Sequence, residues 1–210
     1  FGPGTASAEP PGGPTERAFC EIARALGLWL LPGSLYVREG ERVFNVIPVI
    51  NPRGEVVARH RKMFPFLPYE AGVAAGSEFV VFDVPGVGRI GVSNCYDMWF
   101  PETTRTLAAM GAEVILHPSM TNTIDRDVEH AIARANAASN QIVQVHLPRH
   151  GEWVAGAGRI RQAGFESAYR NRSGQALESV SVLQHVPFLE MPGQRYLALE
   201  VQPRPRAYFR

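Results

Sequence analysis

Apolar residues recur along the chain with two different periods, one helical and one extended. From Phe19 to Leu26 they return at helical spacing, which predicts a helix that Thr15 caps and Gly27 ends. Shorter apolar runs bounded by turn residues predict strands. These runs cover residues 28–32, 34–37, 44–51, 55–59, 79–84, 89–93, 114–116 and 142–146. Two further strands are expected at 180–186 and 196–201, in a stretch where the pattern is weaker.

Turn residues and two later helical stretches order these elements into one layered domain. Asn51-Pro52-Arg53-Gly54 predicts a hairpin turn, and residues 85–88 predict a second one. Pro101 is expected to begin a helix that runs to Met110, because proline is favoured at the first helical position. Residues 124–140 have a helical pattern, whereas 1–14 and 62–76 are predicted to be loops. Helices that alternate with strands predict an α/β domain over residues 1–210, with sheet inside and helices outside.

A balanced composition excludes several classes of function. The 210 residues are 45% hydrophobic and 20% charged, and the formal net charge is +1. This balance gives no footprint for nucleic acid, and no block of Lys and Arg indicates a membrane surface. We find neither an apolar run of about 18 residues nor the pattern of a signal peptide. Two cysteines do not make a disulfide framework, so we expect a reducing, cytoplasmic setting.

Cys95 is the first candidate for chemistry. It follows the apolar run 89–93, and a turn from strand to helix can hold a nucleophile beside backbone N–H groups. A lone cysteine is more often a small buried core residue. Lys62 favours the nucleophile over the buried core residue. The aromatic residues within 64–66 can desolvate the ammonium of Lys62, and a desolvated ammonium near Cys95 favours the thiolate over the thiol. Glu70 then either orients this lysine or accepts a proton, although both are surface residues in most proteins.

Three segments, in this order, resemble the carbon–nitrogen hydrolase (nitrilase) superfamily. Arg61-Lys62 with Pro65-Phe66 resembles its lysine motif, and Tyr69-Glu70-Ala71-Gly72 resembles the loop of its second glutamate. Gly91-Val92-Ser93-Asn94-Cys95-Tyr96-Asp97 resembles its cysteine motif. The hairpin at 51–56, the strand at 111–118 and the helix near 133–141 also match. The resemblance extends from about 15 to about 159, and the ordered set is more specific than any one motif.

The resemblance implies a four-layer αββα sandwich and a thioester mechanism. Cys95 attacks a carbonyl carbon, Lys62 and the backbone N–H of Tyr96 hold the oxyanion, and a glutamate transfers the proton. Tyr and Asp after the cysteine resemble the amidase, carbamoylase and ureidopropionase branches, whereas true nitrilases usually carry Trp and Glu. The expected reaction is therefore hydrolysis of a linear amide or an N-carbamoyl (ureido) compound, with no metal and no organic cofactor.

The sequence does not identify the general-base glutamate that the resemblance implies on an early strand. Glu9 precedes Pro10 in a loop-like segment too close to Lys62, and Glu16 and Glu21 fall on the first helix, where exposure to solvent is expected. The N-terminal strand, helix and strand of the family fold are also not found. Either the chain is a fragment or lacks some residues, or it is a variant without the base. The exposed sheet edge that such a variant would have favours the first explanation.

Further features leave alternatives open. Tyr96 and Trp99 flank the cysteine turn, and they either shape the substrate pocket or simply pack. Residues 160–210 depart from the closing segment of the family. The histidines lack metal-ligand spacing with cysteines or carboxylates; they include His117, His130, His146 and His150.

Two other functions remain alongside the hydrolase. The chain is either a catalytically inactive relative that works in binding or assembly, or a transferase of the acyl or amidino type that uses the same cysteine. The missing base motivates the first alternative, and the shared thioester motivates the second. The partners expected are a small amide or ureido substrate and, by resemblance, further copies of the chain in a homo-oligomer, with no nucleic acid and no membrane.

Overall fold

A long central strand, β3, organises the first of two sheets in the computed structural model, which describes residues 4–119, 126–148 and 198–199. The strands of this sheet are β1 (Trp29–Leu30), β2 (Leu35–Glu39), β3 (Arg42–Ile50), β4 (Val56–Arg61), β5 (Val73–Ala74) and β10 (Ala198–Leu199). β1, β2, β4 and β5 all pair with β3, and β10 pairs with β1. Every residue of β3 after Arg42 is buried, because neighbours cover both edges and both faces, and its sequence is accordingly an almost continuous apolar run.

The second sheet places the ends of parallel strands at one edge. It contains β6 (Val80–Val84), β7 (Gly88–Val92), β8 (Val114–Ser119) and β9 (Val143–Pro148), in that order. β6 and β7 form an antiparallel hairpin, while β7, β8 and β9 run parallel. The parallel connections pass through helices α2 (Pro101–Ala109) and α3 (Arg126–Asn140). Because β7 and β8 are parallel, the residues that follow them lie side by side.

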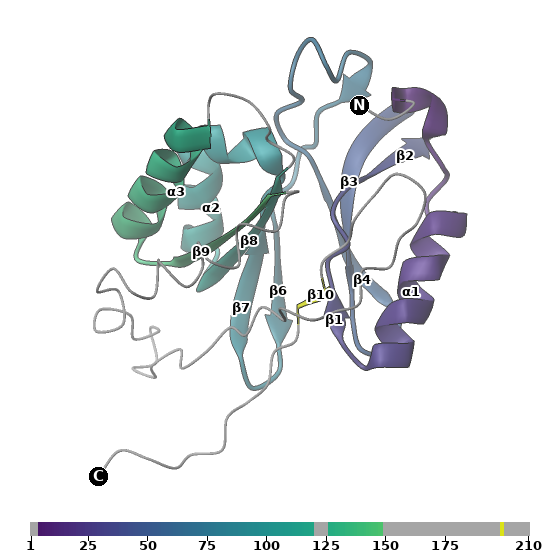
Figure 1. The fold of residues 1–210 in the computed structure, drawn as a ribbon, viewed down its shortest axis with the longest axis horizontal. Helices are drawn as coiled ribbons and strands as arrows, with labels where there is room; N and C mark the ends of the chain where they lie inside the picture. The colour runs from purple at the N-terminus through teal and green to yellow at the C-terminus, as the bar shows by residue number, and fades with distance from the viewer. Residues whose placement is uncertain (1–3, 120–125, 149–197, 200–210) are drawn as a thin grey trace.

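The two sheets face each other between outer helices, as Figure 1 shows, in an αββα sandwich. Helix α1 (Pro14–Leu26) covers the outer face of the first sheet, where Phe19 and Ala23 pack with Ile50. α2 and α3 cover the outer face of the second sheet, and Leu107 packs there with Ile115. Between the sheets lies the main core, in which Ile47 and Val49 of β3 meet side chains of β6, β7, β8 and β9. The layered α/β architecture expected from the sequence is confirmed.

The beginning of α1 differs from the prediction. The helix ends at Gly27 with a φ of +63°, as predicted, but its N-cap is Gly13 and Pro14 takes the first helical position. Thr15 is therefore inside the first turn, and its N–H and hydroxyl donate to the carboxylate of Glu9 at 2.9 and 2.7 Å. The segment predicted as a loop over 1–14 also contains the short helix η1 (Gly4–Ser7) and a bridge from Glu9 to Val37.

Several strand boundaries also shift. β8 continues to Ser119, beyond the predicted 114–116, because it pairs with β9 along its whole length. The loop predicted at 62–76 contains β5, whose two residues run parallel to β3. Ala198–Leu199 forms a strand within the predicted 196–201, whereas the strand predicted at 180–186 and almost all of 160–210 lie outside the described residues. No helix in the described part of the chain is long and apolar enough to cross a membrane.

Candidate active site

Cys95 begins a tight turn at the carboxyl end of β7. The short helix η2 (Cys95–Trp99) follows this strand, and Cys95 has a φ of +50°. A positive φ is uncommon in a residue with a side chain, and such backbone persists where the surrounding structure holds it. Ser93 supplies part of that support, since its N–H donates to the carbonyl of Leu116 at 3.1 Å. The turn leaves the Cys95 side chain half-buried at the edge where β7 and β8 end.

Ser119, the last residue of β8, reaches the sulfur. Its hydroxyl donates to Cys95 Sγ at 3.5 Å, so the thiol has a polar neighbour from the adjacent parallel strand. The contact follows from the topology, because β7 and β8 end at the same edge of the sheet. Both cysteines are free, and neither Cys20 nor Cys95 forms a disulfide.

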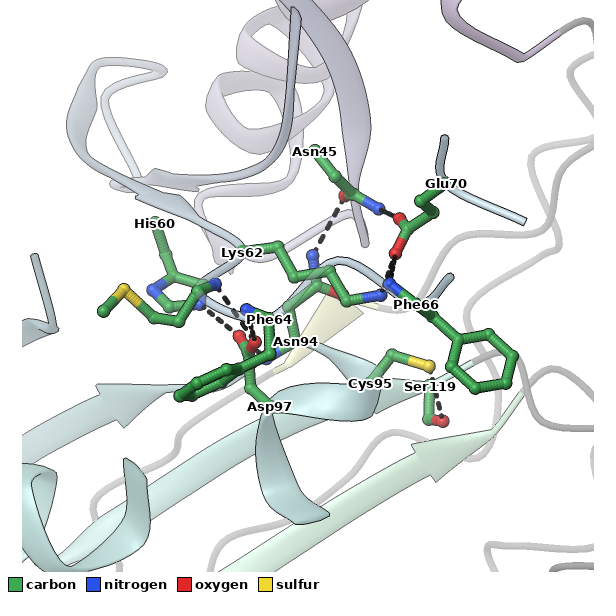
Figure 2. Close-up of polar contacts among 11 residues, drawn as sticks. Asn45, His60, Lys62, Phe64, Phe66, Glu70, Asn94, Cys95, Asp97 and Ser119 are labelled. Atoms are coloured by element: carbon green, nitrogen blue, oxygen red, sulfur yellow. Dashed lines mark hydrogen bonds and ion pairs between the residues drawn. The ribbon is translucent and has the colours of Figure 1, made fainter. Parts of the chain in front are cut away.

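Lys62 follows directly on β4 of the opposite sheet, and its ammonium is buried. The residue is 2% exposed, and its Nζ lies 2.5 Å from Oε2 of Glu70, which is 7% exposed. The structure thus brings together the lysine and the glutamate predicted from the sequence. Figure 2 shows this pair next to the Cys95 turn, with Ser119 on the far side of the sulfur. The exposed-surface alternative for Lys62 and Glu70 is excluded by their burial.

Glu70 is held by three donors. Its Oε2 accepts the Lys62 ammonium and the Phe66 N–H at 2.6 Å, while its Oε1 accepts the Asn45 amide at 2.5 Å. An ionised carboxylate only accepts, so this set of donors suits the charged form and leaves no oxygen without a partner. Burial, together with the negative charge of Glu70, raises the pKa of Tyr36, whose phenol therefore stays neutral beside the pair. The geometry fits Glu70 as the group that orients Lys62.

His60 and Asp97 form a second buried pair beside the first. The ring Nε2 of His60, on β4, lies 2.9 Å from Oδ2 of Asp97 in η2, and both side chains are wholly buried. Asp97 also accepts the backbone N–H groups of Met63 and Phe64 through Oδ1, at 3.0 and 2.9 Å. The carboxylate therefore connects the chain that carries the lysine to the turn that carries the cysteine.

Sequence reasoning missed four polar residues that the fold places here. They are Asn45, His60, Asn94 and Asp97, all of them buried. Asn45 offered a usable signal, because it is the one polar residue within the apolar run 43–50. His60 and Asp97 lie inside the lysine and cysteine segments, but nothing in the order of residues indicates that they pair across 37 positions.

Aromatic rings pack around the Cys95 turn. Tyr96 lies between Phe66 and Trp99, with ring centroids 4.9 and 6.1 Å apart, and it meets Phe100 edge to face at 5.3 Å. Tyr96 and Trp99 thus pack with one another, and Phe66 connects them to the loop that carries Glu70. In Figure 2 the Phe66 ring lies beside the Cys95 side chain. The rings therefore pack, and a role of Tyr96 and Trp99 in shaping the substrate pocket stays a prediction.

The three early glutamates do not approach the cysteine through any contact of the described chain. Glu9 is bound to Thr15, as above, and Glu21 is exposed as expected. The prediction of an exposed Glu16 was wrong: it is buried and pairs with Arg59 at 2.7 Å, because the first turn of α1 faces β4. No group of three His, Cys, Asp or Glu side chains suited to a metal occurs among the residues that the structure describes, and His150 lies outside them.

Comparison with known proteins identifies what this arrangement resembles. A family model described as carbon-nitrogen hydrolase matches residues 4–146. The chain is 36% identical to the nitrilase of Pyrococcus abyssi over 52% of its own length and 41% of that protein. It is 30% identical to the deaminated glutathione amidase of Homo sapiens, covering 71% of this chain and 51% of that one. The chain therefore spans about half the length of the curated relatives that it matches.

Solved structures resemble the chain in the same region. A Saccharomyces cerevisiae member of branch 10 of the nitrilase superfamily aligns with a TM-score of 0.61 and 26% identity, covering 70% of this chain and 55% of that one. An amidase from Nesterenkonia sp. AN1 aligns with a TM-score of 0.56 and 27% identity, covering 63% of this chain and 51% of that one. The aligned protein is a mutant of that amidase, which shows covalent addition of the acetamide moiety of fluoroacetamide at the active-site cysteine.

Proposed function

The chain belongs to the carbon–nitrogen hydrolase family, and on that premise we propose that it hydrolyses a non-peptide carbon–nitrogen bond with Cys95 as nucleophile. One observation carries the proposal: the ammonium of Lys62 is buried and held by Glu70, and Figure 2 shows it next to Cys95 on a constrained turn. A buried lysine next to a thiol favours the thiolate and stabilises the anion formed when the thiolate attacks.

The first half of the proposed reaction forms a thioester. The thiol proton of Cys95 passes to a base, the sulfur forms a bond to the carbonyl carbon, and the carbonyl oxygen becomes an oxyanion. Lys62, with the backbone N–H of Tyr96, stabilises that oxyanion, and one such donor is worth roughly 3–4 kcal/mol in other enzymes. The oxyanion then collapses, the carbon–nitrogen bond breaks, and the base returns its proton to the leaving ammonia or amine.

The second half returns the free enzyme. Water attacks the thioester carbon while the base removes one of its protons, the carbon–sulfur bond breaks, and sulfur regains the proton. The products are a carboxylic acid, or a carbamic acid in the case of a ureide, and the thiol of Cys95. We assign the base to a glutamate other than Glu70, because three donors already occupy the oxygens of Glu70. Glu9 and Glu16 are engaged at the start of α1.

We propose a linear amide or an N-carbamoyl compound as the substrate. Tyr96 and Asp97 after the nucleophile resemble the amidase and carbamoylase branches. Support comes from relatives that are named as amidases, among them the deaminated glutathione amidase of Homo sapiens and the chloroplastic omega-amidase of Arabidopsis thaliana. We also propose a reducing, cytoplasmic setting, because a nucleophilic thiol must stay reduced to act.

Ammonia release from a panel of linear amides, N-carbamoyl compounds and nitriles tests the proposal. We expect release from at least one amide or ureide, and none once Cys95→Ala removes the nucleophile. Intact mass after rapid quenching should show the acyl adduct on the wild-type protein and not on Cys95→Ala. The matched control is Cys20→Ala, the other free thiol, which should keep both activity and adduct. An inactive wild-type protein, or an active Cys95→Ala variant, would contradict the proposal.

A further inference from the structure

Two buried carboxamides connect the sheets at the candidate site. Asn94, which precedes the nucleophile, donates from Nδ2 to Oδ1 of Asn45 at 2.9 Å. Asn45 lies on β3 of the first sheet, and Asn94 follows β7 of the second. A buried amide is costly unless its donors and acceptors find partners, so a residue of this kind in an apolar strand calls for an account of what it binds.

The other end of the Asn45 amide binds the glutamate of the lysine pair. Its Nδ2 donates to Oε1 of Glu70 at 2.5 Å. Because a carboxylate cannot donate, the nitrogen of this amide must face Glu70 and its oxygen is left for Asn94. The backbone of Asn45 holds the same lysine, since the N–H of Lys62 donates to its carbonyl at 2.8 Å. Figure 2 shows the resulting chain of contacts, which runs from Asn94 through Asn45 and Glu70 to the Lys62 ammonium.

We propose that Asn45 is a positioning residue that fixes the Lys62 ammonium relative to Cys95, an inference that rests on the proposed function. Its carbonyl holds the main chain of the lysine, and its amide holds the glutamate that holds Nζ. Its amide oxygen accepts a hydrogen bond from Asn94, the residue that precedes the nucleophile. The lysine and the cysteine come from different sheets, so their separation depends on contacts between the sheets, and Asn45 supplies one such polar contact beside those of Asp97.

Replacement of Asn45 by alanine tests this role. We expect Asn45→Ala to lower kcat roughly 100-fold, the scale of a misplacement of about 1 Å. KM should change little, because Asn45 reaches the substrate only through other residues. Asn51→Ala is the matched control: Asn51 lies one residue after the same strand and is 6% exposed against 8% for Asn45. Its amide binds Glu55 and the hairpin turn at 53–55, so its loss should leave kcat unchanged.

A second variant separates positioning from simple destabilisation. Asn45→Asp keeps the shape and the acceptor for Asn94, but its ionised carboxyl faces Glu70 with like charge. That repulsion raises the pKa of the new carboxyl, so lowering the pH protonates it and restores a donor to Glu70. We expect the ratio of Asn45→Asp to wild-type kcat to rise as the pH falls. The same ratio for Asn45→Ala should stay flat, because alanine cannot regain a donor.

Alkylation of Cys95 by iodoacetamide distinguishes failure of this inference from failure of the proposed function. The alkylation rate reports the lysine beside the thiol and needs no substrate. We expect slower alkylation in Asn45→Ala and the wild-type rate in Asn51→Ala. If wild-type protein hydrolyses no compound of the panel, the proposed function fails while alkylation still decides the role of Asn45. Wild-type alkylation in both Asn45 variants, measured on protein with native circular dichroism, would overturn the inference.

Discussion

The ring Nε2 of His60 lies 2.9 Å from Oδ2 of Asp97, and both side chains are wholly buried between the two sheets. The same carboxylate accepts three backbone N–H groups, those of Met63, Phe64 and Asn94, at 2.9 to 3.1 Å. Because these donors belong to the chain after β4 and to the turn after β7, one acidic side chain fixes the two catalytic segments to each other.

Asp97→Ala should therefore destabilise the protein strongly. The substitution leaves a buried imidazole and three backbone N–H groups without their acceptor. Leaving a buried donor without its acceptor costs roughly 1–3 kcal/mol per group in other proteins. We expect a loss of free energy of unfolding of at least this size, measured from the midpoint and slope of urea denaturation. Asp97→Asn, which keeps one acceptor oxygen, should fall between the alanine variant and the wild type.

Asp83→Ala is the control for that measurement. Asp83 pairs with Arg89 on the β6–β7 hairpin, and its side chain is 67% exposed. The hydrogen bond from Arg89 lowers the pKa of Asp83, so its contribution is present above the unfolded pKa and is lost as the pH falls through the folded pKa. Solvent screens this contribution, and the urea midpoint at neutral pH should stay close to that of the wild type. An Asp97→Ala midpoint equal to that of Asp83→Ala would contradict the role given to the buried pair.

The sequence was sufficient to place the two charged residues of the site, but not the network that holds them. Lys62 and Glu70 lie in one short segment, so a local motif carries their relationship. Asn45 and Asn94 are 49 positions apart and meet only because two sheets face each other. No local pattern encodes a contact that depends on how two sheets are stacked. For the same reason the sequence predicts an exposed Glu16, whereas the fold pairs it with Arg59 across 43 positions.

The same division between local and distant information holds for the fold. The helix end predicted at Gly27 and the hairpin turn predicted at 51–54 are both found. Each depends on residues that limit the backbone locally, a glycine in the left-handed region and a proline-bearing turn. Periodicity alone ends β8 at Leu116, because His117-Pro118-Ser119 has no strand pattern of its own and is held by pairing with β9; only the family resemblance over 111–118 extends the strand. β5 was missed likewise, since two residues are too few to show alternation.

Lys62→Met should abolish most activity while keeping the side-chain volume. The substitution removes the charge that stabilises the oxyanion, and losing one such donor costs roughly 100- to 1,000-fold in kcat. It also leaves the buried Glu70 carboxylate with only two neutral donors, so stability should fall as well. Steady-state kinetics and urea unfolding, measured on the same preparation, separate the two effects.

Arg61→Met is the matched control for the lysine variant. Arg61 is the neighbour of Lys62 in the chain, but its guanidinium pairs with Glu39 at 2.8 Å and is about one third exposed. We expect its kcat to stay near the wild-type value. Equal losses in both variants would mean that any cation removed from this strand disturbs the enzyme, and the special role of Lys62 would be refuted.

The two free thiols should differ in reactivity. Burial, reinforced by the charge of Glu16, raises the pKa of Cys20, so at neutral pH this side chain remains a thiol and alkylates slowly. Its labelling should increase only as the pH rises toward that raised pKa. Cys95 lies beside Lys62 and Ser119, and we expect iodoacetamide to label it first, as peptide mass mapping over time can follow. Equal, slow labelling of both thiols would argue against Cys95 as the nucleophile.

Ser119→Ala should slow the alkylation of Cys95. The hydroxyl donates to Sγ at 3.5 Å, and a donor stabilises a thiolate more than it stabilises a thiol. Its removal should slow the alkylation of Cys95 at a fixed pH, and Ser119→Thr, which keeps a hydroxyl at the same carbon, should restore the wild-type rate. Ser139→Ala serves as the control, because that hydroxyl bonds only to the carbonyl of Asn136 and to Asn140 within α3. If the Ser119→Ala and wild-type proteins are alkylated at the same rate, the hydroxyl does not act on the reacting sulfur, and Lys62 is left as the group that activates it.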